Sequence, residues 1–481
     1  MIVLCVALWA YKEASNTGGS AVLTGIRYRA YPNTEQAETL SQWIGCAKLI
    51  WNAKCDEDRY LSTFAKKYLP VGTFPKPEQS YAQYKSDETL FLRECPSQIL
   101  RNSSVIWFQT YQKYLKGLCG KPRRKKRGRV CSIWLTQELF RFTQCGKSWE
   151  LHIGTPTNDL GVISLKWHRK PISKPKSIWI RREHGQWFVS FCYEDGMPSE
   201  NLCTHEEHLK WLSGCSAKEL HKLITPIDRG IARPVQTDED TYAPDKKALA
   251  RQRRRELRIK REQRHLARQK KHAKHSKRQA KTHKRISKKH QKTANVRKDF
   301  LHKTSRTVVN KAQVIVLEDL RLKNMTARPK AKKNPHTGRY EKNNAASKAG
   351  LNRALLGVGL GMFEVFVCYK AYRANKPVFK INPINTSREC APCGHIHPDN
   401  RVSQSIFRCQ RCGHEDNADR NAAWVIRKRA ISLILDSGTE LAGKNGNILR
   451  LRTHANPRKT KTGKPGFAKG CASKKIAAKS A

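Results

Sequence analysis

The sequence predicts a multidomain protein of mixed α and β structure, and three observations lead to this fold class. The chain has 481 residues, which is enough for two to four domains. Helical and strand-like patterns of apolar residues occupy separate stretches of the chain. Two Cys-x-x-Cys pairs near its C-terminal end indicate a small metal-stabilised module.

The two ends of the chain are predicted to be disordered. Residues 1–23 form an N-terminal extension in which Met1 to Ala10 are apolar. This stretch lacks the basic residues of a secretory signal and is too short to span a bilayer. No later stretch approaches transmembrane length, so we expect no membrane partner. Residues 441–481 are basic and punctuated by Gly and Pro, which predicts a disordered tail.

The folded part begins with a helical domain set within a β-rich one. A short alternating strand in 24–34 and several alternating runs in 126–200 predict one β-domain, a small barrel or sheet. Between them, residues 35–125 carry apolar side chains at helical spacing, which predicts a helical domain. The polar stretch 201–220 is predicted to be a linker.

The charge of the chain points to a polyanionic partner. Ninety-five Lys and Arg oppose 39 Asp and Glu, giving a formal charge of +56 and a pI near 10.2. Such a chain repels itself unless a polyanion neutralises it, and phosphate backbones are the usual partner. Ribosomal or chromatin packing proteins and polybasic membrane-surface proteins share this charge, so charge alone does not separate them from other nucleic-acid binders.

Residues 246–292 are the most basic segment. They contain 22 Lys and Arg against two Glu, with no Gly or Pro, which predicts one long helix. The helix lacks a continuous apolar stripe, so we expect nucleic-acid contact rather than a core position; a disordered basic linker is the alternative. The arginines expected to contact phosphates are Arg253, Arg254, Arg258, Arg261, Arg264 and Arg268.

Four of the 16 cysteines form a predicted structural zinc site. Cys390 and Cys393 are followed after fifteen residues by Cys409 and Cys412. Each pair forms a knuckle, and two knuckles complete a closed tetrahedral shell without an open position for catalysis. The other cysteines are scattered singly, which predicts free thiols in a reducing, cytoplasmic compartment.

Three acidic residues are candidates for a catalytic metal site. Asp228 and Glu318 each end an apolar, strand-like run, and Asp419 stands at the entrance of a predicted helix. Carboxylates that converge in this way repel one another, and divalent cations such as Mg²⁺ remove the penalty. Two such ions can hold both reacting oxygens of a phosphodiester. Asp416 competes with Asp419 for the third position, and the spacing alone does not decide between them.

These residues lie in motifs that resemble one known family. Ile227-Asp-Arg-Gly, Val316-Leu-Glu-Asp-Leu and Ala418-Asp-Arg-Asn-Ala-Ala resemble the three split RuvC motifs of TnpB proteins and of compact type V CRISPR effectors. The cysteine pairs lie between the second and third motifs, as in that family. Tyr28-Arg-Ala-Tyr-Pro and Thr386-Ser-Arg-Glu-Cys390 resemble its N-terminal signature and the start of its ribbon. The resemblance covers about residues 24 to 440.

The resemblance implies a fold for each part of the chain. It implies an RNase-H-like RuvC core in 221–385 and 414–440, with the basic helix inside it and a zinc ribbon inserted at 386–413. It also implies a β-barrel wedge domain and a helical recognition domain. The sequence departs from the family pattern in three places. Arg229 stands where many members have Leu, Trp424-Val-Ile stands where Asn-Ile is usual, and residues 1–23 have no counterpart.

The same resemblance implies the activity of an RNA-guided DNA endonuclease in a prokaryotic, nucleoid-associated setting. Asp228, Glu318 and Asp419 become the catalytic triad, binding two Mg²⁺ ions. The implied partners are a guide RNA from the end of the mobile element, target double-stranded DNA and a separate transposase of the same element. Gln98 and Arg101 are the candidates for reading a short DNA motif beside the target.

Three other functions remain open at the level of sequence. One is a catalytically silent RNA-guided DNA-binding protein or transposon accessory, which would be expected to lack a triad carboxylate. Another is an unguided RuvC-type nuclease or a transposase, which would not need the long basic helix. A basic packing protein would need neither the triad nor the cysteine pairs.

Overall fold

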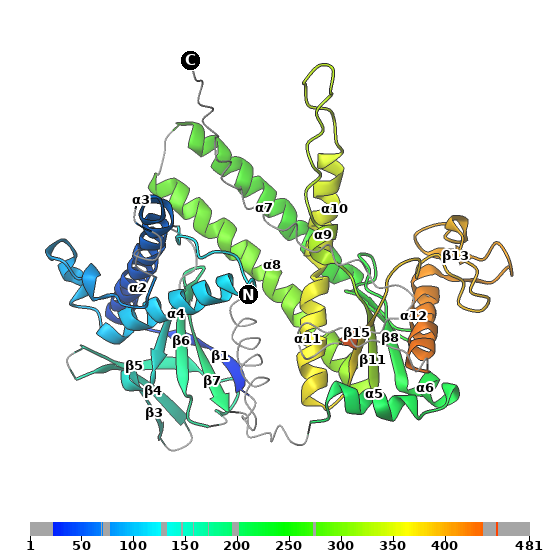
Figure 1. Ribbon diagram of the computed structural model, residues 1–481, viewed down its shortest axis with the longest axis horizontal. Helices are drawn as coiled ribbons and strands as arrows, with labels where there is room; N and C mark the ends of the chain where they lie inside the picture. The colour runs from blue at the N-terminus through cyan, green and yellow to red at the C-terminus, as the bar shows by residue number, and fades with distance from the viewer. Residues whose placement is uncertain are drawn as a thin grey trace, which may run out of the picture. The chain divides into compact units, whose positions relative to one another are not determined.

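A computed structural model gives the fold as two compact units (Figure 1). It describes residues 23–68, 70, 77–126, 132–145, 148–156, 158–171, 173–194, 202–272, 276–435 and 449–450. Unit 1 comprises Met1–Leu202 and Lys247–Val296, and unit 2 comprises Cys203–Lys246 and Arg297–Ala481. The predicted N-terminal extension lies outside the described residues except for Leu23, which begins the first strand.

A seven-stranded antiparallel sheet forms the centre of unit 1 (Figure 1). Its order is β2-β6-β7-β1-β5-β4-β3, so the first strand pairs with strands that follow more than a hundred residues later. The strands are β1 Leu23–Tyr31, β2 Ser132–Thr136, β3 Phe140–Cys145, β4 Ser148–Thr155, β5 Asn158–Lys166, β6 Ser177–Glu183 and β7 Gln186–Glu194. A closed barrel would need pairing between β2 and β3, which is not among the strand pairs of the described residues.

Alternating burial explains why these residues form strands. In β7, Val189, Phe191 and Tyr193 are fully buried on one face, and Ile178 and Ile180 of β6 join the same core. Large aromatic and β-branched side chains at every second position suit a half-buried pleated strand.

Two long helices cover this sheet. α2 (Thr34–Tyr60) begins at Asn33, which forms a capping box with Gln36. α4 (Ser97–Leu115) packs beside it, where the Ser103 hydroxyl donates to the Ala47 carbonyl at 2.6 Å. The short helices of this region are η1 Leu61–Ala65, α3 Lys66–Tyr68, η2 Ala82–Tyr84, η3 Asp87–Leu92 and, between β2 and β3, η4 Gln137–Leu139.

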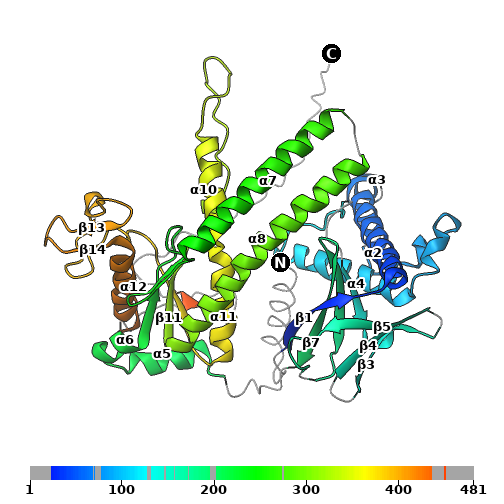
Figure 2. The ribbon, with the colours of Figure 1, turned by 180° about the vertical axis from the view of Figure 1, so that it is seen from behind.

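The predicted single basic helix is two helices that lie side by side, α7 (Lys246–His272) and α8 (Lys277–Lys311) (Figure 2). The Ser276 hydroxyl accepts a hydrogen bond from the backbone N–H of Gln279, as a helix N-cap does, so a new helix starts here. Residues 247–296 cluster with unit 1, whereas the sequence had assigned the basic segment to the nuclease core.

A sparse seam holds the two basic helices together. Ile259 and Leu266 of α7 are buried, as are Thr282 and Ile286 of α8. Spacings of seven residues in α7 and four in α8 put the two buried residues of each helix on one side of it. Polar groups complete the seam: the Lys289 ammonium lies 2.9 Å from a Glu262 carboxylate oxygen.

Unit 2 is built on a parallel sheet in the order β15-β12-β11-β8. Its strands are β8 Ile224–Ile227, β11 Val314–Glu318, β12 Val378–Ile381 and β15 Leu449–Arg450. Every residue of β11 is buried, as expected for a parallel strand covered on both faces. A short hairpin of β9 (Val235–Gln236) and β10 (Thr241–Tyr242) follows β8.

Helices cover both faces of the parallel sheet. Val314 and Val316 point to one face with α5 (His205–Ser213), α6 (Ala217–Leu223) and α12 (Ala418–Leu435). Ile315 and Leu317 point to the other face with the last turns of α8 and with α11 (Leu360–Arg373).

Helices α5 and α6 correct the predicted linker 201–220. Each begins with a capping box, Thr204 with Glu207 and Ser216 with Glu219, and each buries one leucine against the sheet. Both capping boxes can be read from the sequence as a Ser or Thr followed three residues later by Glu, but the polar composition of the stretch led to the prediction of a linker. The predicted tail also has one described part, because Leu449–Arg450 pair with β12; its other residues lie outside the described ones.

One helical stretch, Ala345–Arg373, is long and apolar enough to cross a membrane by length and composition, which the sequence reading had overlooked. It consists of α10 (Ala345–Val358) and α11, separated by Gly359 with φ +83°. Phe363 and Val367 of α11 are buried in the core of unit 2. The apolar character of α11 therefore belongs to a core helix. A short helix, α9 (Leu322–Met325), precedes this stretch.

Candidate active site and metal centre

Two of the three candidate catalytic carboxylates stand at the same edge of the parallel sheet. Strands β8 and β11 pair in the register Ile227 with Leu317, so the next residues, Asp228 and Glu318, follow side by side at the carboxyl ends. Asp228 also forms an antiparallel bridge with Gln236, with N–H···O distances of 2.9 and 3.0 Å. Its backbone is therefore fixed from two sides.

The third candidate, Asp419, lies in the first turn of α12. The Asn417 side-chain oxygen accepts from the backbone N–H of Asp419 at 3.1 Å and caps the helix. Two guanidinium groups lie near the carboxylate: Arg401 Nη2 is 3.4 Å from Oδ1, and Arg233 Nε is 4.0 Å from Oδ2. Asp419 thus lies in a mixed acidic and basic site.

The three carboxylates are close enough to perturb one another. Burial, with the charges of Glu318 and Asp419, raises the pKa of Asp228 to about 7. Burial also raises the pKa of Glu318, against the effect of a hydrogen bond from the Thr386 hydroxyl at 2.5 Å. Asp416 is not among the groups that raise the Asp228 pKa. The structure therefore brings Asp228, Glu318 and Asp419 together and places Asp416 elsewhere, in strand β14 (Glu415–Asn417).

The donor set fits hard divalent cations. Carboxylate oxygens are the ligands that Mg²⁺ prefers, and a bound cation would relieve the repulsion that raises the Asp228 pKa. Among the described residues, only the four cysteines bring at least three metal-ligand atoms within 4.8 Å of one another. The three carboxylates are therefore more widely spaced than the ligands of that compact single-ion site.

A buried charge network behind the carboxylates was missed by sequence reasoning. The Arg229 side chain is fully buried; its Nη2 donates to the Glu318 main-chain carbonyl at 2.6 Å, and its Nη1 to Glu364 at 2.7 Å. Lys380 donates to the other Glu364 oxygen at 2.5 Å. Burial opposes ionisation of Glu364, but the charges of Arg229 and Lys380 hold its pKa below the ordinary value. Two features of the sequence could have indicated this network: Lys380 lies in an otherwise apolar strand, and Glu364 lies in an apolar helix.

The four cysteines form the second candidate site. Cys390 Sγ lies 3.6 Å from Cys412 Sγ, and Cys393 Sγ lies 3.6 Å from Cys409 Sγ. A tetrahedral zinc with bonds of about 2.3 Å separates its sulfurs by about 3.8 Å, so the sulfur positions fit zinc.

The two knuckles have equivalent backbones. Gly394 donates to the Cys390 carbonyl at 2.8 Å, and Gly413 to the Cys409 carbonyl at 3.1 Å. Both glycines adopt positive φ, +72° and +69°, which closes each turn. Strand β13 (Ile406–Arg408) pairs with β14 across this module, and a short helix, η6 (Pro398–Asn400), lies between the knuckles.

The predicted nucleic-acid contacts have different environments. All six arginines of α7 are exposed: Arg253, Arg254, Arg258, Arg261, Arg264 and Arg268. Gln98 is buried and donates to the Glu138 carboxylate, and Arg101 lies 3.2 Å from the same carboxylate. Arg101 is exposed, whereas Gln98 would have to leave its partner to reach a base. These roles stay predictions.

Three family models match separate parts of the chain. One described as "Helix-turn-helix domain" covers residues 20–54, whose described part here forms β1 and most of α2. One described as "Probable transposase" covers 216–328, which includes Asp228 and Glu318. One described as "Cas12f1-like, TNB domain" covers 361–426, which includes the four cysteines and Asp419.

Two relatives match over most of the chain. A protein named "Putative RNA-guided DNA endonuclease InsQ" from Escherichia coli K12 is 28% identical over 83% of this chain and 90% of its own length. One named "Putative RNA-guided DNA endonuclease" from Streptomyces pristinaespiralis is 24% identical over 84% and 88%. A solved structure titled "Cryo-EM structure of the Cas12f1-sgRNA-target DNA complex" is 15% identical, covers 85% of this chain and 100% of that chain, and has a TM-score of 0.30. That score is too low to assign a fold.

Proposed function

Because the chain belongs to the TnpB family, we propose that it is an RNA-guided DNA endonuclease that hydrolyses phosphodiester bonds with divalent cations. The observation that carries the proposal is the convergence of Asp228, Glu318 and Asp419 at one site. Burial, together with the charges of Glu318 and Asp419, raises the pKa of Asp228 there to about 7. A cluster of acids that includes the buried Glu318 and raises the pKa of a neighbouring carboxyl is typical of a functional site. In the proposal, unit 2 supplies an RNase-H-like RuvC core, and the unit 1 sheet and helices supply the wedge and recognition domains.

The carboxylates would hold the cations, two Mg²⁺ ions in the proposal, which would supply the Lewis acid for phosphodiester hydrolysis. The sheet edge fixes Asp228 and Glu318, and Asn417 fixes the turn that carries Asp419. Arg229 holds the main chain at Glu318 in place through its hydrogen bond to the carbonyl.

The basic helices supply the proposed contacts to the guide RNA and its duplex with DNA. The exposed arginines of α7 lie on successive turns, so they can follow a phosphate backbone without reading bases. Base pairing with the guide then reads the target sequence, and a short motif beside the target is read as double-stranded DNA. The four cysteines would hold zinc as a structural ion.

The decisive experiment separates cleavage from binding. The protein is purified from cells that carry its native locus, the accompanying RNA is sequenced, and cleavage of a matching DNA target is measured with Mg²⁺. We expect a discrete RNA with a variable 3′ segment and cleavage of the matching DNA. A mixture of unrelated cellular RNA, with no cleavage of any matching target, would contradict the proposal.

Single carboxylate variants test the triad. Asp228→Ala, Glu318→Ala and Asp419→Ala are each expected to lower the cleavage rate by at least about a thousandfold while guided binding stays within about twofold, because they remove metal ligands and no nucleic-acid contact. The matched control is Asp416→Ala, which should cleave nearly as the wild type does. An inactive Asp416→Ala beside an active Asp419→Ala would overturn the third assignment.

A further inference from the structure

The Thr386 hydroxyl is buried against one of the candidate catalytic carboxylates. It lies 2.5 Å from Glu318 Oε1, and the Pro383 carbonyl, at 3.2 Å, is its other possible acceptor. A hydroxyl has one proton to donate, and the short bond to the ionisable oxygen is the stronger of the two. Thr386 is 3% exposed and Glu318 is 6% exposed. Within the part of the chain that the structure describes, Glu318 Oε2 has no hydrogen bond or ion pair, so this oxygen is left for a cation.

A tight turn after strand β12 brings Thr386 to this position. Ile381, the last residue of β12, pairs with Glu318 in the parallel sheet. Asn385 adopts a positive φ of +61°, which asparagine tolerates better than most residues, and its carbonyl accepts from the Glu389 N–H at 3.0 Å. The chain therefore leaves the sheet beside Glu318 and returns to the same carboxylate five residues later with a defined backbone.

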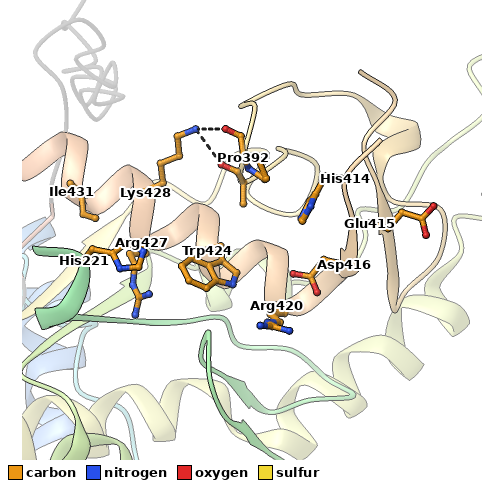
Figure 3. A pocket seen from close by; sticks show the side chains of 11 residues that line it. His221, Pro392, His414, Glu415, Asp416, Arg420, Trp424, Arg427, Lys428 and Ile431 are labelled. Atoms are coloured by element: carbon orange, nitrogen blue, oxygen red, sulfur yellow. Dashed lines mark hydrogen bonds between the residues drawn. The ribbon is translucent and has the colours of Figure 1, made fainter. Parts of the chain in front are cut away.

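The same turn is tied to helix α12, which carries the third candidate carboxylate. The fully buried Asn421 side chain donates from Nδ2 to the Glu389 carbonyl at 2.7 Å and accepts from the Ala391 N–H at 3.0 Å. Lys428 Nζ donates to the carbonyls of Ala391 and Pro392, at 3.2 Å each, beside a pocket (Figure 3). The segment that begins the cysteine module therefore joins the edge of the sheet to the helix of the third carboxylate.

From these contacts we propose that Thr386 is a positioning residue of the nuclease: its hydroxyl holds the Glu318 carboxylate in the orientation in which Oε2 binds a cation. Donors of this kind orient ligating carboxylates, and removing one typically costs about 10- to 100-fold in metal affinity or activity. A glutamate side chain has several rotatable bonds, so a carboxylate without this donor loses more rotamer freedom when a cation binds. The inference rests on the proposed function for the role of Glu318 as a ligand, and it adds a residue outside the acidic triad.

Two variants that differ by a single oxygen atom test the hydroxyl. Thr386→Ser keeps the donor and Thr386→Ala lacks it, while both lack the methyl group. We expect Thr386→Ala to raise the Mg²⁺ concentration for half-maximal guided cleavage by at least about tenfold, and Thr386→Ser to stay within about threefold of the wild type. The rate at saturating Mg²⁺ should change less, because excess cation restores occupancy. Thr304→Ala is the matched control, since Thr304 is a 5% exposed threonine of unit 2 in helix α8, and it should match the wild type.

A second donor-free variant covers the case in which Thr386→Ala does not fold. Thr386→Val keeps the branched shape and lacks the hydroxyl, so the same loss of cation affinity is expected. Folding of every variant is checked by thermal unfolding. A folded Thr386→Val with the Mg²⁺ dependence of the wild type would overturn the proposal.

Cation binding is also measured without DNA cleavage. Fe²⁺ takes the place of Mg²⁺, and with ascorbate and hydrogen peroxide it produces hydroxyl radicals that break the main chain beside its site. The full-length protein with its co-purified RNA is titrated with Fe²⁺, and the fragments that end near Asp228 and Glu318 are quantified. Thr386→Ala should need at least about tenfold more Fe²⁺ for half-maximal fragmentation, and Thr386→Ser about as much as the wild type.

The outcomes separate this inference from the proposed function. Equal Fe²⁺ midpoints for the wild type, Thr386→Ala and Thr386→Ser would overturn the positioning role alone. An equal loss in both variants would overturn it as well, because the methyl group rather than the hydroxyl would then be responsible. Loss of guided cleavage with the difference in Fe²⁺ midpoints intact would overturn the proposed function alone. A wild type without fragmentation near Asp228 and without Mg²⁺-dependent cleavage would overturn both.

Discussion

At the scale of single residues, a buried arginine stabilises the main chain beside the acidic site. Arg229 follows Asp228 directly, is fully buried and reaches both the Glu318 carbonyl and the Glu364 carboxylate. An arginine fork can bridge two groups in this way, whereas a lysine ammonium cannot hold the same planar geometry. The main chain on which two candidate ligands stand is thus fixed by one side chain.

Arg229→Leu is therefore expected to affect stability and catalysis separately. Breaking the buried pair should lower the free energy of unfolding by about 3 kcal/mol, measured by urea denaturation. The double variant Arg229→Leu/Glu364→Leu should regain most of this stability, because no unpaired carboxylate remains. Its single-turnover cleavage rate should stay at least about tenfold low, since the Glu318 carbonyl still lacks its donor. Recovery of both properties in the double variant would show that Arg229 does not position the site.

The raised pKa of Asp228 predicts a pH dependence with a definite sign. The folded protein binds this proton with a pKa of about 7, against 3.8 for the ordinary aspartate. Without divalent cations, the free energy of unfolding should therefore fall as pH rises from about 4 to about 7. Cation binding must displace the proton, so the Mg²⁺ concentration for half-maximal cleavage should rise about tenfold per pH unit below 7.

Asp228→Asn is the control for the stability part of this prediction. Its neutral amide keeps the side-chain shape and has no proton to lose in this range, so this contribution to the pH dependence of thermal unfolding should disappear. An unchanged dependence in Asp228→Asn would assign it to another group.

Single residues also mark the limit of sequence reasoning at this site. Asp228, Glu318 and Asp419 were predicted because each stands at the end of a strand-like run or the start of a helix. Spacing alone left Asp416 as a rival of Asp419, because the two acids are three residues apart, and only the motif resemblance favoured Asp419. Glu364 and Lys380 were not predicted, because their pairing with Arg229 joins parts of the chain far apart in sequence.

At the scale of elements, the two cysteine knuckles form one unit of structure. Each offers two sulfurs, and neither can complete a metal site alone. Cys409→Ala should lower bound zinc, measured by atomic absorption, to well below one per chain, and should expose residues 386–413 to limited proteolysis. Cys119→Ala, which removes an exposed thiol of unit 1, should leave both unchanged. Full zinc content in Cys409→Ala would rule out this ligand set.

The sequence predicted elements well where a local pattern was strong. It predicted them less well where contacts between distant parts of the chain determine the structure. The zinc spacing, the buried strand β11 and the strands around β7 follow from motif and periodicity. The pairing of α7 with α8 depends on contacts between residues far apart in sequence, such as the ion pair between Glu262 and Lys289. No pattern within one helix reveals that pairing.

At the scale of the whole molecule, the net charge of +56 predicts strong dependence of binding on salt. Arg258→Ala, in the exposed row of α7, should reduce the slope of log affinity for guide RNA against log salt by about 0.7 to 0.9, with little change in sequence preference. Anisotropy titrations between about 50 and 300 mM salt check this. An unchanged slope in Arg258→Ala would place the RNA elsewhere.

The topology of unit 2 has a consequence for synthesis of the protein. Strand β8 ends at Ile227, and its parallel partner β11 begins only at Val314, after both α7 and α8. On the ribosome, β8 therefore emerges without a neighbour and waits while the basic helices are made at roughly 5–20 residues per second. The sheet that carries Asp228 and Glu318 can close only once most of the chain exists, and Asp419 joins later still. A translation product truncated before Val314 would hold the complete basic segment, able to bind RNA, without the assembled carboxylates.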